Sequence, residues 1–358
     1  MPVPTAYDQP EPLQEAEQIE LSQTAGPMHT GLRLDQVAAQ MFPDYSRARL
    51  QEWIKEGQLT LNGEVMRAKD KVLEGDQVVL MAEMEAAIDF KPETMALDIV
   101  YEDDDVIVVN KPVGLVVHPA AGNYSGTLLN GLLAHCPELQ TLPRAGIVHR
   151  LDKDTSGVLL LARTDRIARA LSEALRHRNV RKIYWAAVAG VPYPRAGSIK
   201  YGLLKAPGRG RGGEAEKMRC IHPSEVATTE GAKRAHTDYA VLTNLGTRMA
   251  WLALVPITGR THQLRAHIAE VGHPIIGDGK YGGSQQENLG DGWGAGIGGD
   301  GISNKLHLHA RTIIFEHPIT KKEITITAPL PEHMQKTWEY VGWDVTHAPL
   351  DPFNMPDA

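Results

Sequence analysis

The spacing of hydrophobic residues predicts a small helix-and-strand module near the start of the chain. Two amphipathic helices come first, and in the second of them Trp53 and Ile54 lie on one apolar stripe. Two short strands follow, with Asn62-Gly63 as a tight turn. The four predicted elements span 33–42, 46–55, 59–61 and 78–80. We place this module at residues 31–90.

From about residue 97 onward, apolar runs of strand length outnumber the helical patterns. A helix is predicted over 127–136, and a second begins after Thr164 as its cap and runs to about His177. The predicted strands span 99–100, 106–110, 157–162, 183–188, 251–256, 306–315 and 323–328. This pattern predicts an α+β domain with a large, mainly antiparallel sheet and flanking helices. We assign it residues 95–345.

The remaining segments lack sustained periodicity. Residues 1–30 carry five acidic residues and no Lys or Arg, which predicts a disordered acidic tail. We expect a second tail at 346–358. The Gly-rich stretch 290–301 is predicted to be a mobile insertion, because no strand precedes it and no helix clearly follows it, as a phosphate-binding loop would require.

Composition narrows the class of protein. The chain has 358 residues, 42% of them hydrophobic, so two or more globular domains are expected. No apolar run approaches about 18 residues, and the N-terminus resembles no signal peptide, so neither a membrane span nor secretion is predicted. Cys136 and Cys220 make neither a disulfide framework nor a CxxC zinc site, which favours a reduced cytoplasm.

Charge is distributed unevenly along the chain. The formal net charge is −7, which by itself argues against a nucleic-acid partner. Residues 141–220, however, carry 17 Lys and Arg against six Asp and Glu. These residues would form a polyphosphate-binding surface if they share one face, or a solvated surface if they are scattered.

A polar loop between two apolar runs is the first candidate for chemistry. It reads His149 to Gly157 and contains two carboxylates, Asp152 and Asp154, each with cationic neighbours. Loops held between buried strands commonly carry function. The pair is compatible with acid–base chemistry, with a metal site, or with a cluster of salt bridges.

Two further segments add candidate residues. Arg265, in the helix that opens at Gly259, is a candidate to hold a buried carboxylate through a bidentate pair. Tyr184 follows a basic pair and would either stack on a nucleobase or belong to the core. A metal site is not expected, because His262 and His267 lie about 140° apart on a helix.

Together these segments resemble the RluA-type pseudouridine synthases over about residues 30–335. The matching motifs are His149–Gly157, Arg181–Tyr184 and Gly259–Arg265, supported by Asn110-Lys111-Pro112, His118-Pro119 and Leu308-His309-Ala310. The module in front resembles the S4 (αL-like) RNA-binding fold, through Ser46, Arg47, Gly57, Asn62, Gly63, Gly75 and Asp76. This module and the run 143–148 are most similar to the RluD branch, which modifies the helix 69 loop of 23S ribosomal RNA.

The resemblance implies roles for individual residues. Asp152 is the implied catalytic carboxylate, Arg265 its counter-charge, and Tyr184 the residue that stacks on the target base and assists loss of the C5 proton. Leu264 would pack against that ring, and Arg150 would fill the space that the flipped base leaves. The implied RNA-binding residues are His149, Arg47, Arg49, Arg163, Arg178 and Arg181, with Arg166, Arg169, Arg176, Arg209 and Arg211 further along the basic segment. The reaction needs no redox change or energy input, so no cofactor is implied.

The implied partner is 23S ribosomal RNA or a precursor of the large subunit, without a membrane, and we expect a monomer. Three alternatives stay open. The chain could resemble the RluC branch in its target and act at other 23S sites. It could be a non-catalytic ribosome-assembly protein that only binds RNA. It could also be a hydrolytic glycosidase that uses Asp152 and Asp154.

Overall fold

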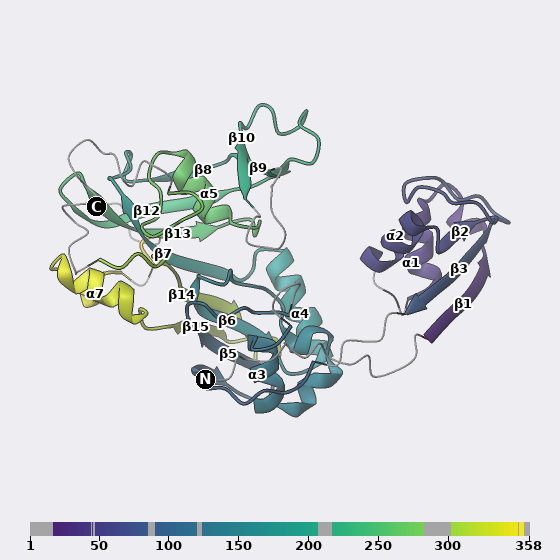
Figure 1. Ribbon diagram of the computed structural model, residues 1–358, viewed down its shortest axis with the longest axis horizontal. Coiled ribbons are helices and arrows are strands. Elements are labelled where there is room, and N and C mark those ends of the chain that lie inside the picture. The colour runs from purple at the N-terminus through teal and green to yellow at the C-terminus, as the bar shows by residue number, and fades with distance from the viewer. Residues whose placement is uncertain are drawn as a thin grey trace, which may run out of the picture. The chain divides into compact units, whose positions relative to one another are not determined.

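The computed structural model describes residues 17–43, 45, 47–84, 90–119, 124–206, 217–282, 302–349 and 351–353. The chain divides into two compact units, Met1–Asp89 and Phe90–Ala358, which we call the N-terminal and C-terminal units (Figure 1). Among the described residues, no helix has the length and apolar character needed to cross a bilayer. The Gly-rich stretch 290–301, with Arg209, Arg211 and Ser46, lies outside the described residues.

The N-terminal unit packs two helices against a three-stranded antiparallel sheet. The helices are α1 (Leu34–Met41) and α2 (Arg47–Glu56), and the strand order within the sheet is β1-β3-β2. Their bounds are β1 (Glu17–Thr24), β2 (Leu59–Leu61) and β3 (Gln77–Met84). Both helices bury their apolar stripes in one core, with Leu34, Leu50 and Trp53 almost inaccessible to solvent. A short 3-10 helix, η1 (Pro27–His29), joins β1 to this core.

Strand β1 corrects the prediction of a disordered tail over residues 1–30. It pairs with β3 along its whole length, from Glu17 opposite Met84 to Thr24 opposite Gln77, and Ile19 packs against the core. The sequence of β1 is mostly polar, so its order comes from pairing with a strand about 60 positions later. A local pattern cannot show such pairing. Residues 1–16 lie outside the described residues.

The C-terminal unit is built on one nine-stranded mixed sheet, which confirms the predicted α+β class. The order is β4-β5-β6-β14-β7-β13-β12-β8, with β15 paired to β14. All pairings are antiparallel except that of β14 with β6. The bounds are β4 (Ile99–Glu102), β5 (Val106–Lys111), β6 (Ser156–Ala162), β7 (Arg181–Ala189), β8 (Ala196–Ile199), β12 (Thr237–Leu245), β13 (Met249–Pro256), β14 (Leu308–Glu316) and β15 (Glu323–Thr327).

Helices cover both faces of this sheet (Figure 1). The core of one face includes side chains of α3, α4 and α5, and the core of the other face includes Met334 and Trp338 of α7. The helix bounds are α3 (Leu128–His135), α4 (Asp165–Arg176), α5 (Gln263–Glu270) and α7 (Glu332–Tyr340), with 3-10 helices η2 (Pro137–Thr141), η3 (Pro143–Gly146) and η6 (Val345–His347). Helix α4 begins as predicted, since the Thr164 hydroxyl accepts a hydrogen bond from the Ile167 amide at 3.3 Å. A second small sheet has the order β10-β9-β11, with β9 (Gly202–Lys205), β10 (Met218–Ile221) and β11 (Lys233–Arg234).

Strand β7 separates the two cores by simple alternation. Tyr184 faces the core of α3, α4 and α5, whereas Ile183 and Trp185 face the core of α7. Trp185 stacks on Trp338 with ring centroids 5.4 Å apart. Aromatic packing therefore holds the face of β7 that carries Trp185, and the opposite face, which carries Tyr184, can contribute to a functional site.

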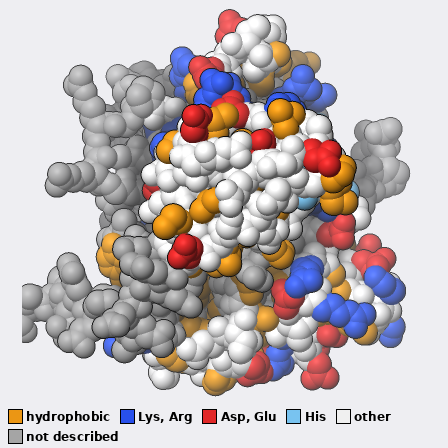
Figure 2. Space-filling model, turned by 90° about the vertical axis from the view of Figure 1, so that its right-hand side faces the viewer, with side chains coloured by type: hydrophobic (Ala, Val, Ile, Leu, Met, Phe, Trp, Pro, Cys, Tyr) orange, Lys and Arg blue, Asp and Glu red, His pale blue; other side chains and the backbone are white. Residues whose placement is uncertain are grey.

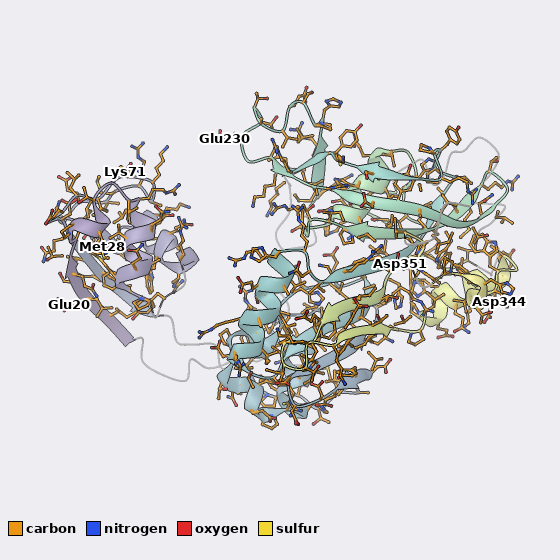
Figure 3. The ribbon with its side chains drawn as sticks, turned by 180° about the vertical axis from the view of Figure 1, so that it is seen from behind. Glu20, Met28, Lys71, Glu230, Asp344 and Asp351 are labelled. Atoms are coloured by element: carbon orange, nitrogen blue, oxygen red, sulfur yellow. The ribbon has the colours of Figure 1, made fainter. Side chains whose placement is uncertain are left out.

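The end of the chain corrects the predicted tail over 346–358. Phe353 packs against the core of α7, and the Asp351 carboxylate forms an ion pair with Arg181 of β7 at 2.9 Å. In Figure 3, Asp351 lies beside the central strands, far from Asp344 at the outer end of the unit. The prediction failed because the contacts that hold this segment are made with a strand about 170 positions earlier.

Candidate active site

A cavity of about 330 Å³ lies where the loop before β6, the start of β7 and the start of α5 meet. It brings together six residues that sequence reasoning singled out in three separate motifs: His149, Arg150, Asp152, Tyr184, Leu264 and Arg265. A larger cavity of about 980 Å³ lies elsewhere and is lined by none of these six. We identify the smaller cavity as the candidate active-site pocket because it holds the convergent charged groups.

Asp152 enters the pocket from a loop whose backbone is held by a buried lysine. Its side chain is 24% exposed, so it can meet a ligand. The buried Lys111 ammonium donates to the carbonyls of Pro112, Leu115 and Lys153 at 2.8–2.9 Å, which ties the loop to the end of β5. Burial lowers the pKa of Lys111 to about 8, and the charges of Asp154 and Asp152 oppose this shift. Sequence reasoning noted Lys111 only as part of a motif and did not assign it a role.

The glycine that ends the loop is required by close packing. Gly157 has φ of +111°, and a Cβ atom there would lie 2.1 Å from the carbonyl oxygen of Ala310. The residue stands where β6 meets β14 in the one parallel pairing of the sheet. A larger residue would push the two strands apart at the end of the loop that carries Asp152.

Arg265 has two carboxylate neighbours, and its bidentate partner is Asp278. Its Nε and Nη2 donate to the two oxygens of Asp278, both at 2.8 Å, whereas Nη1 lies 3.6 Å from Asp152 Oδ2. Sequence reasoning paired Arg265 with Asp152 and did not single out Asp278. Asp278 is therefore the residue that orients the guanidinium, and the remaining nitrogen, Nη1, is directed toward Asp152.

A second chain of contacts reaches Asp152 through His262 and Tyr281. The Tyr281 hydroxyl accepts a hydrogen bond from the Met218 amide at 2.8 Å and lies 3.0 Å from His262 Nδ1. If the hydroxyl donates its single proton to Nδ1, the proton of a neutral His262 is on Nε2, which lies 3.7 Å from Asp152. Burial lowers the pKa of His262, which favours that neutral form. Sequence reasoning weighed His262 as a metal ligand and included it in the motif Gly259–Arg265 without a role, and it did not single out Tyr281.

Tyr184 and Leu264 form the apolar side of the pocket. Tyr184 is 8% exposed and Leu264 is 7% exposed. Burial raises the pKa of the Tyr184 hydroxyl, and the charge of Asp152 raises it further. Tyr184 is therefore a neutral phenol at physiological pH. Asp154 is exposed and does not line the pocket, so the two loop carboxylates do not act on one ligand there.

The basic residues of the C-terminal unit are divided between the pocket and other surfaces. Arg150 is exposed and lines the pocket, and Arg178 and Arg181 line a neighbouring groove. Arg163 lies elsewhere and is held by Glu138 at 2.8 Å, by Glu102 at 3.6 Å and by the Asp103 carbonyl. Arg163 is therefore not a free cation, because carboxylates from distant segments pair with it, and its role in RNA binding stays a prediction.

Two predicted RNA-binding residues of the N-terminal unit also have internal partners. Arg47 donates to the fully buried carboxylate of Asp35 at 2.7 Å, although its side chain stays 49% exposed. Arg49 lies over the ring of Trp53 and pairs with Glu52 at 3.2 Å. Both guanidinium groups are thus oriented by the fold of the module.

Within the described residues, one cluster has the composition of a metal site, and its hydrogen bonds argue against that use. Asp103, Asp105 and His317 place their ligand atoms within 4.8 Å of one another. His317 Nδ1 accepts hydrogen bonds from the amides of Ile319 and Thr320, so the proton of the neutral ring is on Nε2. That nitrogen lies 3.1 Å from Asp103 and donates to it, so it offers no lone pair to a metal.

Comparison with known proteins identifies the family. The RNA pseudouridylate synthase profile matches residues 105–270, and the S4 domain profile matches residues 32–78. A protein of Neisseria meningitidis serogroup B named ribosomal large subunit pseudouridine synthase D is 44% identical over 84% of this chain and 76% of its own length. Proteins of the same name from Vibrio vulnificus and Escherichia coli K12 are both 38% identical over 92% of this chain, and over 97% and 96% of their own lengths.

A solved structure points the same way. Human RNA pseudouridylate synthase domain containing 4 is 30% identical and covers 68% of this chain and 92% of its own, with a TM-score of 0.53. The resemblance found in the motifs is therefore confirmed, and so is the S4 domain in front of them. The chain belongs to the RNA pseudouridine synthase family.

Proposed function

We propose that this enzyme isomerises uridine to pseudouridine in 23S ribosomal RNA, in the loop of helix 69, with Asp152 as the catalytic residue. The relatives that cover nearly the whole chain are named as large-subunit pseudouridine synthases, which supports the ribosomal substrate. The observation that carries the proposal is the convergence of Asp152, Tyr184 and Arg265 in one pocket.

The chemistry breaks the bond between C1′ and N1, turns the uracil, and joins C5 to C1′. C5 loses a proton and N1 gains one, so atoms and oxidation state are conserved and the reaction requires no cofactor. The Asp152 carboxylate acts at the sugar, either on C1′ or by removing a sugar proton. The Arg265 guanidinium, 3.6 Å away, stabilises the negative charge on Asp152 without covering it.

The pocket also suits an extruded base. A uridine stacked in RNA must be flipped out before Asp152 can reach its sugar, at a cost of a few kcal/mol. Tyr184 and Leu264 offer an apolar wall against which the uracil can stack. Tyr184 stacks on the base and assists loss of the C5 proton; since its phenol is neutral in the free protein, the nearby Asp152 carboxylate is the proposed acceptor of that proton. Arg150, exposed at the rim, fills the vacated place in the RNA.

The N-terminal unit contributes RNA docking. Between residues 31 and 82 it carries seven basic and eight acidic residues, and acidic, basic and apolar side chains are interspersed on the face seen in Figure 2. Its binding would therefore depend on RNA shape and on oriented side chains such as Arg47 and Arg49, rather than on net charge. We expect a monomer that works in the cytoplasm on ribosomal RNA or a large-subunit precursor.

Mapping of pseudouridines in ribosomal RNA tests the proposal. A strain that lacks the protein should lose pseudouridine in the helix 69 loop of 23S RNA, and wild-type protein but not Asp152→Asn should restore it. Loss at other 23S sites would favour the RluC-type alternative. An unchanged map would favour a binding protein without catalytic activity, although such a protein would not need Asp152 exposed beside Arg265.

A further inference from the structure

A second cavity, of about 560 Å³, continues the active-site pocket. The two cavities share the lining residues Val148, His149, Lys182, Pro256, Thr258 and Gly259. We call the second cavity the basic groove, because Arg176, Arg178 and Arg181 line its far part. Asp238 is a carboxylate in its wall, and that carboxylate accepts hydrogen bonds from Ser198 and His236. When the target base of an RNA strand enters the pocket, the neighbouring part of that strand can lie in the basic groove.

Two donors at the junction of the cavities, one on partly exposed Lys182 and one buried on His149, have no acceptor among the described residues. Lys182 lies two positions before Tyr184 on β7, hence on the same face of the strand, and lines both cavities. Within the part of the chain that the structure describes, its ammonium has no hydrogen-bond or ion-pair partner. Burial lowers the pKa of this ammonium, as expected where no counter-charge is present.

The second donor is the imidazole of His149. Its Nε2 accepts a hydrogen bond from the Leu160 amide at 3.0 Å, so the proton of the neutral ring is on Nδ1. Nδ1 is buried and has no hydrogen-bond partner in the described part of the chain. Burial and the nearby charge of Lys182 lower the pKa of His149 to about 3, so the ring stays neutral and keeps this single donor. An unsatisfied buried donor calls for an explanation, and His149 differs from the buried indole donors of the other core in that it lines two cavities beside Lys182.

We propose that Lys182 and His149 form an anion subsite that binds a backbone phosphodiester next to the target uridine. The inference deepens the proposed function and rests on RNA as the substrate. The ligand is a phosphodiester because it is the anionic group of RNA, and the subsite lies at the junction between the nucleoside pocket and the groove. Its acceptor oxygens would satisfy both donors at once. Lys182 is thus a binding residue that anchors the RNA strand beside the pocket.

Variants of the full-length protein test the role of Lys182 by separating KM from kcat. With a stem-loop RNA of the helix 69 sequence, Lys182→Ala should raise KM about 10-fold or more while kcat changes little, because one charge-assisted contact is lost. Lys182→Arg should recover part of the affinity. The slope of binding against salt should fall by roughly 0.7, the share of one phosphate contact in single-stranded RNA. Lys321→Ala is the matched control, because Lys321 is exposed and lines neither cavity.

A change in the RNA tests the same contact without a protein variant. Methylphosphonate linkages, which are neutral, are placed one at a time on either side of the target uridine. The wild-type protein should lose about 10-fold in affinity at one linkage, and Lys182→Ala should be insensitive to that linkage. Equal sensitivity of both proteins, or an unchanged KM in Lys182→Ala, would overturn the subsite. Pseudouridine formation that persists in that case would leave the proposed function standing.

Discussion

Asp278 offers the sharpest test of how the pocket is built, because it supports Arg265 without touching the ligand space. The substitution Asp278→Asn keeps the size of the side chain and removes its charge. The asparagine can still accept one hydrogen bond from Arg265, but its amide group would face a second guanidinium N–H. Asp278 and Arg265 are 1% and 5% exposed, so water cannot replace the lost bond.

The expected magnitudes follow from this geometry. Breaking a buried, hydrogen-bonded ion pair costs about 3–5 kcal/mol, which should lower the Tm of the C-terminal unit by roughly 6–20 °C. Arg265 then has Asp152 as its remaining carboxylate partner and should shift toward it from 3.6 Å. Such a displacement at a reacting group should lower kcat by about 100-fold, with KM changed much less.

Two assays are needed for Asp278→Asn: thermal unfolding by circular dichroism, and release of tritium from RNA labelled at C5 of uridine, at a temperature where the variant is folded. Asp35→Asn in the N-terminal unit is the control, since Asp35 is equally buried and holds Arg33 and Arg47. It should lower stability and leave kcat on a short stem-loop unchanged. A folded Asp278→Asn with wild-type kcat would refute the reasoning that Arg265 is oriented by Asp278.

Two further predictions concern the modules and the effect of pH. Removal of residues 1–89 should raise KM for ribosomal RNA and leave kcat on a short stem-loop within a few-fold of wild type; an equal loss in kcat would contradict a separate docking module. Burial lowers the pKa of His149 and His309 to about 3 and of His267 and His307 to about 4, from an ordinary 6.5. The unfolded chain therefore binds protons below pH 6.5 that the folded chain does not, and the free energy of unfolding should fall as the pH drops toward 4. Each histidine contributes up to about 1.4 kcal/mol per pH unit, so urea unfolding of His309→Gln should show a shallower loss, whereas a curve parallel to wild type would contradict this assignment.

From the sequence, the residues of the pocket could be predicted only where they stand in contiguous motifs. Asp152, Tyr184 and Arg265 stand in such motifs, and the apolar alternation of β7 placed Tyr184 and Ile183 on opposite faces. Asp278 and Tyr281 could not be found in this way, since their importance arises from contacts with Arg265 and His262 across a loop. The nearest available signal was the polar, glycine-containing run Gly277 to Tyr281, which follows the end of α5 by several residues.

In the fold, too, elements set by local sequence features were predicted, and elements held by partners far along the chain were not. Helices α2 and α4 were predicted to within a residue or two, because their apolar stripes and the Thr164 cap are local features. Strand β1 and the segment Asp351–Phe353 were predicted as tails, because partners far along the chain hold them in place. Strand β12 was likewise not predicted, although it pairs with both β13 and β8.

The central claim, that Asp152 carries the chemistry, is tested most directly by turnover of the full-length Asp152→Asn variant. The assay compares tritium release from RNA labelled at C5 of uridine with binding of the same RNA. The account predicts that release is abolished while affinity stays close to wild type, because the amide keeps the shape of the side chain and cannot act at the sugar. Release near the wild-type rate would contradict the account and remove Asp152 from the reaction.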